Sequence, residues 1–381
     1  MRLTLDDLRR YAVARTLFKP TTLMRAIDRL GFVQADPIRA PARAQDLTLR
    51  HRVAGYRAGD LQRRYPTLAV EEGFFVNYGF LPRAAQALLH PRQPRVEWPA
   101  DRQQLAARVL EHVAAHGVVH PRQVAAAFDC GTVVTWFGGS ARASTELLDG
   151  MHHRGLLRVA GREGGTRLYA LPSPVQAPLL PLEQRLDALV QRIVGLYAPL
   201  PQASFQQLVG YLGMGGPAWK AACRQAGKRV WAQLGCAVVD GVHWAWPIDE
   251  QPGSKQWQPD DQVRLLAPFD PVVWDRRRFE LLWGWRYRFE AYTPAPKRQL
   301  GYYAMPLLWR GQVIGWGNLA VVDGQLQTQL QYVAGKAPDE AAYAPALTAE
   351  LEALGHFLAL AAQDGPGSGS DGELQLDAGL G

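Results

Sequence analysis

The chain has 381 residues, enough for two to four domains of ordinary size, and its 48% hydrophobic content excludes a disordered chain. Residues 1–172 carry 25 Lys and Arg against 15 Asp and Glu, whereas residues 173–381 carry 17 against 20. Lys19 is the only lysine of the first half. Because the arginine fork binds phosphate through two nitrogens, this excess favours a nucleic-acid partner. The arginine bias of a GC-rich genome is the alternative explanation.

The three cysteines, Cys130, Cys223 and Cys236, are too few and too scattered for a disulfide framework and lack the spacing of zinc ligands. The N-terminal residues do not form a signal peptide, and no apolar run reaches the length of a membrane span. We therefore expect a cytoplasmic, nucleoid-associated protein that is a monomer. We expect no metal, no other cofactor and no membrane partner.

Residues 1–95 are predicted to form a first winged-helix-like domain. Helices are expected over residues 4–18, with Thr4 as the N-cap, and over residues 21–30, closed by Gly31. Phe32-Val33 and residues 74–78 are short apolar pieces. Between them runs a basic stretch whose arginines stand at positions 39, 43, 50, 52, 57, 63 and 64.

Residues 88–100 contain three prolines and are predicted to be a linker. The next unit, residues 100–174, shows the element order of a winged helix. We expect helices at 101–116, 121–128 and 141–154, then a hairpin of 156–160 and 166–170 with a Gly161–Gly165 turn. In a winged helix the third helix enters the major groove of DNA and the hairpin touches the backbone.

Residues 180–250 are predicted to repeat this order as a third winged-helix domain, with helices at 182–197 and 217–231. A hairpin of 236–239 and 243–246 is expected to turn at Asp240-Gly241, a strong hairpin signal between alternating apolar residues. The three similar units indicate an internal tandem.

Residues 258–350 change to the two-residue period of strands. The strand-like pieces are 287–292, 301–309, 312–322 and 325–332, and they predict a small antiparallel β-barrel. Its tryptophans are expected to be core residues. A terminal helix is expected to end at 362, and the Gly- and Ser-rich residues 364–381 to be disordered. The predicted fold class is therefore α+β, with tandem winged-helix domains followed by a C-terminal antiparallel β-barrel.

Gln34 and Asp36 lie two positions apart, so an extended segment would place them on one side. An amide offers a donor and an acceptor and a carboxylate offers a base, so together they could hold a water molecule and take its proton. The alternative is structural: Asp followed by Pro37 is a common helix start, with Asp as the N-cap.

Two blocks of the sequence resemble the AlkZ/YcaQ-type DNA glycosylases. The first is Gln34-Ala35-Asp36-Pro37-Ile38 together with Ala42-Arg43-Ala44-Gln45-Asp46. The second starts at Leu265 and continues through Ala267-Pro268-Phe269-Asp270-Pro271, Tyr287-Arg288-Phe289-Glu290 and Lys297-Arg298-Gln299 to Tyr303. The resemblance covers most of residues 1–350, strongly at 30–46 and 265–310.

The resemblance implies tandem winged-helix domains around a C-terminal barrel and hydrolysis of the N-glycosidic bond of N7-alkylated purines in base excision repair. In some members it also implies unhooking of interstrand crosslinks. Gln34 and Asp36 match the family's Gln-x-Asp motif and would be the catalytic residues, with Asp36 as general base and Gln34 as a contact to water or sugar. The motif places no lysine for a Schiff base, so no lyase step is expected. A non-catalytic winged-helix DNA-binding protein, either a transcription regulator or a damage binder, is the alternative. An RNA-binding adaptor is a third interpretation.

The residues predicted to contact DNA are basic side chains near these two blocks: Arg39, Arg43, Arg50, Arg52, Arg276, Arg277, Lys297 and Arg298. For those beyond 270, a solvated or ion-paired surface is an equally good explanation. The strand expected at Gly315–Ala320 is uncharged where the family usually carries charge, which puts its part in holding DNA in doubt.

Overall fold

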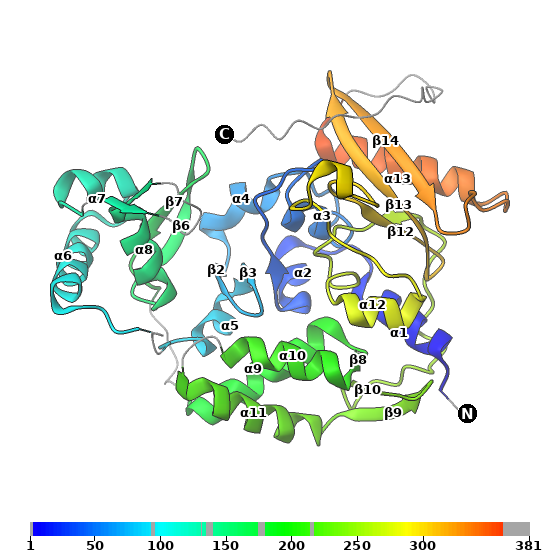
Figure 1. Cartoon of the computed structure of the whole chain (residues 1–381), viewed down its shortest axis with the longest axis horizontal. Coiled ribbons are helices and arrows are strands. Elements are labelled where there is room, and N and C mark those ends of the chain that lie inside the picture. The colour runs from blue at the N-terminus through cyan, green and yellow to red at the C-terminus, as the bar shows by residue number, and fades with distance from the viewer. Residues whose placement is uncertain are drawn as a thin grey trace. The chain divides into compact units, whose positions relative to one another are not determined.

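The computed structural model describes residues 3–92, 96–130, 132–134, 140–173, 180–213 and 217–360 (Figure 1). The chain divides into two compact units, and each is assembled from separate stretches of sequence. Unit 1 consists of Met1–Thr21, Asp36–Ala58 and Gln251–Gly381, and unit 2 of Thr22–Ala35 and Gly59–Glu250. The segment 1–95, predicted as one domain, is thus shared by both units. The predicted disordered tail, 364–381, lies outside the described residues.

The helices of unit 1 begin where the sequence supplies a cap. Thr4 and Asp7 form a reciprocal capping box at the first helix, so the predicted N-cap is confirmed. Asp275 caps α12 by accepting the Arg278 N–H at 3.1 Å. The helices of the unit are α1 (Leu5–Thr16), α3 (Ala44–Leu49), α12 (Arg276–Trp283) and α13 (Tyr343–Leu358).

The sheet of unit 1 is antiparallel, with the strand order β11-β12-β13-β14. The strands are β11 (Arg264–Leu265), β12 (Met305–Trp309), β13 (Gln312–Val322) and β14 (Gln325–Tyr332). The turns at Arg310-Gly311 and Asp323-Gly324 each have two successive residues with positive φ, as a tight hairpin requires. Helix α13 lies against the sheet (Figure 1). Its Tyr343 ring lies 5.2 Å from the ring of Trp309 in β12, measured between centres.

The predicted closed barrel is wrong for the described part of the chain, where β11 and β14 leave the sheet open. The segment 287–292, predicted as a strand, has no strand pairing. Its alternating aromatic residues pack as an irregular loop instead, with Phe289 5.0 Å from Phe269 and 5.5 Å from Tyr303. Alternation here reflects ring packing and not a pleated strand.

The core of unit 1 joins residues that are far apart in sequence. Val13 and Leu17 near the end of α1 pack with Leu266, Phe279 and Leu308, among others. Trp283, Trp285 and Trp316 cover this cluster, which agrees with the prediction that the tryptophans belong to the core. This burial joins the first and third stretches of the unit.

The first part of unit 2 is a three-stranded antiparallel sheet with the order β1-β3-β2. Its strands are β1 (Val33–Gln34), β2 (Val70–Phe74) and β3 (Tyr78–Pro82), and the neighbouring helices are α2 (Leu23–Leu30), α4 (Asp60–Arg64) and α5 (Arg83–Leu88). Gly31 closes α2 with φ of 74°, as predicted. The apolar piece 74–78 is not one strand but the turn between β2 and β3.

The second part of unit 2 contains the helices and the hairpin expected over 100–174, in the predicted order, and two short strands, β4 and β5, that were not predicted. These are α6 (Ala100–His116), α7 (Pro121–Ala127), β4 (Thr132–Val134), β5 (Ser140–Arg142), α8 (Ala143–His153), β6 (Arg158–Glu163) and β7 (Thr166–Ala170). The hairpin turns at Gly164 and Gly165, both with positive φ. Three helices followed by this hairpin match the predicted element order. The winged-helix assignment itself remains a prediction.

The third part of unit 2 has the strand order β8-β10-β9. Its elements are α9 (Leu182–Tyr197), β8 (Leu200–Pro201), α10 (Gln202–Leu212), α11 (Pro217–Trp231), β9 (Gly235–Val239) and β10 (Val242–Trp246). Asp240 and Gly241 form the predicted turn, with φ of 49° and 74°. No helix in the described ranges is long and apolar enough to cross a membrane.

Candidate active site

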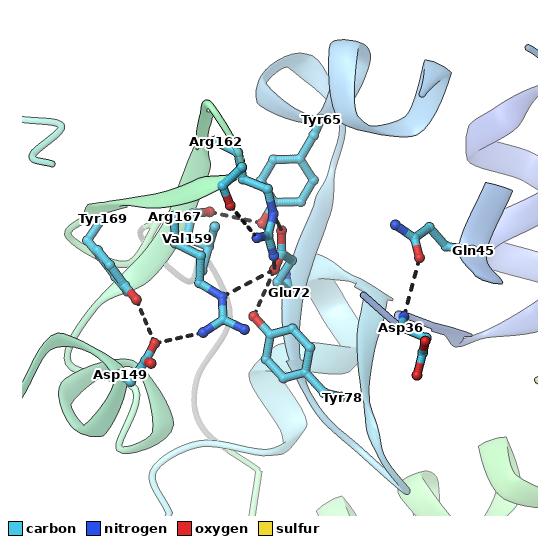
Figure 2. Close-up of polar contacts among 11 residues, drawn as sticks. Asp36, Gln45, Tyr65, Glu72, Tyr78, Asp149, Val159, Arg162, Arg167 and Tyr169 are labelled. Atoms are coloured by element: carbon cyan, nitrogen blue, oxygen red, sulfur yellow. Dashed lines mark hydrogen bonds and ion pairs between the residues drawn. The ribbon is translucent and has the colours of Figure 1, made fainter. Parts of the chain in front are cut away.

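Asp36 is half-buried and opens the second stretch of unit 1 (Figure 2). Its Oδ1 accepts the N–H of Ile38 at 2.9 Å, and its own N–H points to Oε1 of Gln45 at 3.5 Å. No helix begins at Pro37, because the next helix, α3, starts at Ala44. The alternative that Asp36 is an N-cap is therefore wrong. The side chain turns back on its own backbone over two residues, and its second oxygen is not used by this turn.

The carboxylate of Asp36 has no cationic partner: none of the described residues forms an ion pair with it. Burial raises the pKa of Asp36, and the hydrogen bond from Ile38 opposes that change only in part. Burial raises the pKa of Tyr303 and of Tyr292, and in both the negative charge of Asp36 is the next cause. A half-buried carboxylate with phenols around it and no arginine to neutralise it is suited to act as a base.

Gln34 lies in unit 2, at the end of the short strand β1 opposite Gly79 of β3. Only 6% of it is exposed. Strand β1 ends at Gln34, and the shared face predicted for Gln34 and Asp36 stays a prediction. The Ala35 N–H donates a hydrogen bond to the carbonyl of Tyr78, so Gln34 is held in the edge strand of this sheet.

Three of the predicted DNA contacts are corrected by the structure, because their guanidinium groups are occupied inside unit 1. Arg52 is fully buried; it binds both oxygens of Asp270, at 2.7 and 3.0 Å, and the carbonyls of Thr16 and Thr48. Arg50 forms a buried ion pair with Glu350. Arg276 is half-buried and donates to the carbonyls of Val273 and Pro268, at 2.6 and 3.0 Å. The buried guanidinium groups of Arg50 and Arg52 hold unit 1 together and cannot reach phosphate, and two carbonyls already occupy that of Arg276.

The other predicted contacts keep access to solvent. Arg39, Arg277 and Lys297 are exposed, and none of them forms an ion pair with the residues that the structure describes. Arg43 and Arg298 are half-buried. Arg298 donates from Nε to the carbonyl of Thr293 at 2.8 Å and leaves its terminal nitrogens for other partners. Charges of this kind are the ones that a DNA backbone could neutralise.

No role was predicted for Gln45 or Tyr303, although both stand in the blocks that carry the resemblance. Gln45 is buried in α3 and supplies the acceptor nearest the backbone N–H of Asp36. Tyr303 follows an irregular loop and not the predicted strand. The aromatic spacing around it was the only available signal, and the same spacing is found in ordinary cores.

A second acidic centre, which the sequence did not indicate, lies in unit 2 (Figure 2). Glu72 of β2 is 2% exposed and accepts the Tyr78 hydroxyl at 2.8 Å. Arg162 Nη2 lies 2.6 Å and Arg167 Nε 3.9 Å from its Oε2. Asp149 in turn accepts hydrogen bonds from Arg167 and from Tyr169. Two cations neutralise Glu72, so this carboxylate is suited to hold structure and not to accept a proton.

The two strands of the hairpin predicted as a wing, β6 and β7, form ion pairs with the acidic residues of β2. Arg158 and Arg162 of β6 bind Glu71 and Glu72, and the hydroxyl of Tyr65 donates to the carbonyl of Val159 at 2.9 Å. The hairpin is thus fastened to β2 along its arms, while Gly164 and Gly165 at its tip stay exposed. Of this hairpin, the exposed tip is the part left available for a contact with a DNA backbone.

The uncharged strand 315–320 has a packing role that explains its composition. A Cβ on Gly315 would lie 2.0 Å from the carbonyl oxygen of Gln331, so β13 and β14 approach too closely for a larger residue there. Trp316 and Asn318 both donate to the carbonyl of Leu300, at 3.0 and 2.8 Å. In the described residues no group of three or more His, Cys, Asp or Glu could hold a metal ion.

Comparison with known proteins identifies the class of this chain. The model of the family described as DNA glycosylase AlkZ-like matches residues 27–357. The chain belongs to the AlkZ-like DNA glycosylase family, which confirms the resemblance seen in the two sequence blocks. In three dimensions it is similar to the Streptomyces sahachiroi DNA glycosylase AlkZ, with a TM-score of 0.61 and 13% sequence identity. The similarity covers 94% of this chain and 98% of that one, so the two share a fold over nearly their whole length.

Proposed function

We propose that this protein is a monofunctional DNA glycosylase that hydrolyses the N-glycosidic bond of N7-alkylated purines in duplex DNA. Interstrand crosslinks through such bases are a further substrate class to be tested. The observation that supports the proposal most strongly is the Asp36 carboxylate, half-buried and without a cationic partner, in a chain of this glycosylase family.

The reaction needs little help at the leaving base. An N7-alkylated purine already carries a positive charge, so it takes the electron pair of the C1′–N bond and leaves as a neutral base. The deoxyribose becomes oxocarbenium-like, and a nearby carboxylate stabilises that charge. Water then forms the new C1′–O bond and gives its proton to Asp36. A raised pKa makes Asp36 a stronger base as long as the pH stays above that pKa.

Gln34 has the smaller part in this proposal. Its burial leaves little of the side chain for substrate. We expect it to contribute through one hydrogen bond, to the sugar or to the water. Loss of the Gln34 amide should therefore reduce turnover less than loss of the Asp36 charge.

The DNA backbone would be held by the exposed cations Arg39, Arg277 and Lys297, with Arg43 and Arg298 beside them. Since no lysine is placed by the Gln-x-Asp motif, the product should be an abasic site in an unbroken strand. Cleavage of the strand at that site by the purified protein would contradict a monofunctional mechanism.

The test is release of 7-methylguanine from methylated duplex DNA under single-turnover conditions. Asp36→Asn keeps an oxygen that can accept the Ile38 N–H, so the local turn survives while the charge is lost. We expect turnover to fall by about 10²- to 10⁴-fold with duplex binding retained. Asp339→Asn removes a surface carboxylate of the same unit that is 80% exposed, and is the matched control.

Two outcomes would contradict the proposal. Equal turnover of Asp36→Asn and wild type would remove Asp36 from the mechanism. A wild-type protein that binds duplex DNA but releases no base from either methylated or nitrogen-mustard-crosslinked duplexes would be the non-catalytic DNA-binding protein instead.

A further inference from the structure

Tyr303 carries a buried hydroxyl without a hydrogen-bond partner. The residue is 3% exposed, and its Oη meets no donor or acceptor in the parts of the chain that the structure describes. A phenol can donate one hydrogen bond and accept others, and leaving this capacity unused inside a protein costs free energy. Such a group needs an explanation, and a ligand or a bound water is the usual one.

The backbone that leads into Tyr303 is held rigidly. Oε2 of the buried Glu290 accepts the N–H groups of Gln299, Leu300 and Gly301, at 2.8, 2.7 and 3.3 Å. Trp316 and Asn318 of β13 fasten the Leu300 carbonyl from the other side. The loop therefore has little freedom, and the position of Tyr303 is fixed before any substrate arrives.

The ring of Tyr303 is fixed as well. Phe289 packs against it at 85°, with 5.5 Å between the ring centres, and the next carbonyl, of Ala304, accepts the Tyr287 hydroxyl at 2.6 Å. With the ring held, the position of the hydroxyl oxygen is held as well.

Asp36 is the acidic group that acts on this hydroxyl. Burial raises the pKa of Tyr303 well above its usual range, and the Asp36 charge is the next cause; Tyr287 and Tyr292 also raise it and Arg276 lowers it. The phenol therefore stays protonated. The Asp36 charge acts on the Tyr303 hydroxyl, but no direct hydrogen bond joins the two groups. A bridging water molecule would give the unpartnered hydroxyl and the carboxylate one hydrogen-bond partner each.

We propose that the Tyr303 hydroxyl and the Asp36 carboxylate hold one water molecule between them, and that this water is the nucleophile of the reaction. This inference rests on the proposed function. The water donates one hydrogen to Asp36 and the other to Tyr303 Oη, so its lone pair is left for C1′. As the new C1′–O bond forms, Asp36 takes the proton and the phenol keeps its own. Tyr303 is then a positioning residue for the attacking water.

The first test compares Tyr303→Phe with Tyr302→Phe, which removes a hydroxyl from the neighbouring residue of the same loop. We expect Tyr303→Phe to lower single-turnover base release by about 10- to 100-fold without changing the Kd for duplex DNA. The acid limb of its pH–rate profile should move to higher pH, because the carboxylate loses the water that stabilises its charged form. If the role of Tyr303 were purely structural, Tyr303→Phe would not move the pH–rate profile. It would also not lower base release while leaving the Kd for duplex DNA unchanged.

The second measurement does not depend on turnover: a high-resolution crystal structure of the wild type and, where it crystallises, of Tyr303→Phe. The wild type should show a water within hydrogen-bond distance of both Asp36 and Tyr303 Oη. If this water is present but no base is released, the water site stands and the proposed glycosylase reaction falls. If base is released but the water is absent, or if the two phenylalanine variants are equally active, the role of Tyr303 is overturned.

Discussion

Two carboxylates, one in each unit, show how surroundings decide what an acid does (Figure 2). Glu72 is almost completely buried, yet Arg162, Arg167 and the Tyr78 hydroxyl satisfy it. Asp36 is less buried, yet it has no cation and only one hydrogen bond to its carboxylate from the described residues. Burial alone therefore does not mark the reactive acid. What separates them is whether the charge is already neutralised, and this is the difference that experiments should address.

The largest effect that separates the two acids is on turnover. Asp36→Asn should lose about 10²- to 10⁴-fold in base release, whereas Glu72→Gln should keep near-wild-type turnover per folded molecule. The measurement is single-turnover release of 7-methylguanine, scaled by the folded fraction from circular dichroism. A Glu72→Gln protein that is folded but as inactive as Asp36→Asn would break the comparison, since both acids would then serve catalysis.

The loss of stability should be larger for Glu72→Gln than for Asp36→Asn, which is the opposite order to the loss of turnover. Glu72→Gln leaves Arg162 and Arg167 facing a neutral amide, and loss of one partner of a buried ion cluster costs about 3 kcal/mol. Urea unfolding followed by fluorescence measures this, with Asp339→Asn as the surface control, for which we expect a change below about 1 kcal/mol. An equally small change for Glu72→Gln would show that its arginines find other partners and that Glu72 is not what fastens the hairpin.

The sequence predicted helices, strands and turns better than it predicted which side chains contact each other. The cap at Thr4, the turn at Asp240-Gly241 and the strand 166–170 follow from local chemistry and were correct. The barrel failed because the alternating rings at 287–292 serve packing and not a strand. Burial also corrected Arg50, Arg52 and Arg276. Their partners, such as Glu350 and Asp270, lie more than 200 positions away for the first two, so an arginine count could not distinguish core cations from free ones.

For the candidate site, the resemblance supplied Asp36, but local patterns did not indicate Gln45 or Tyr303. Alternation predicted a shared face for Gln34 and Asp36, and of these two residues strand β1 contains only Gln34. Gln45 and Tyr303 reach the region from a helix nine positions on and from a loop far along the chain. Tertiary packing brings Tyr303 there, and a single sequence carries no pairwise signal for such an arrangement.

The contrast between free and neutralised charges extends to DNA binding. Arg277 is exposed and has no ion-pair partner in the described ranges, whereas Arg63 is exposed but paired with Asp60 at 2.6 Å. Arg277→Ala should lower the slope of log Kd against log salt by about one, and Arg63→Ala should lower it by much less. Titrations of duplex DNA at several salt concentrations give the slopes. Equal slopes for Arg277→Ala and wild type would place Arg277 outside the DNA contact.

The smallest effect concerns the stability of Asp36 itself, and its sign is opposite to that of an ion-paired acid. Burial raises the folded-state pKa of Asp36, so the folded protein prefers the neutral form and ionisation is a cost. Any stability from this group is fully present below the unfolded pKa and is lost as the pH rises through the folded pKa. Asp36→Asn should therefore be slightly more stable than wild type near neutral pH. This advantage should shrink as the pH falls through the folded pKa, which urea unfolding at a series of pH values would show. A variant less stable than wild type at neutral pH would mean that the ionised carboxylate has a stabilising partner, and Asp36 would then resemble Glu72.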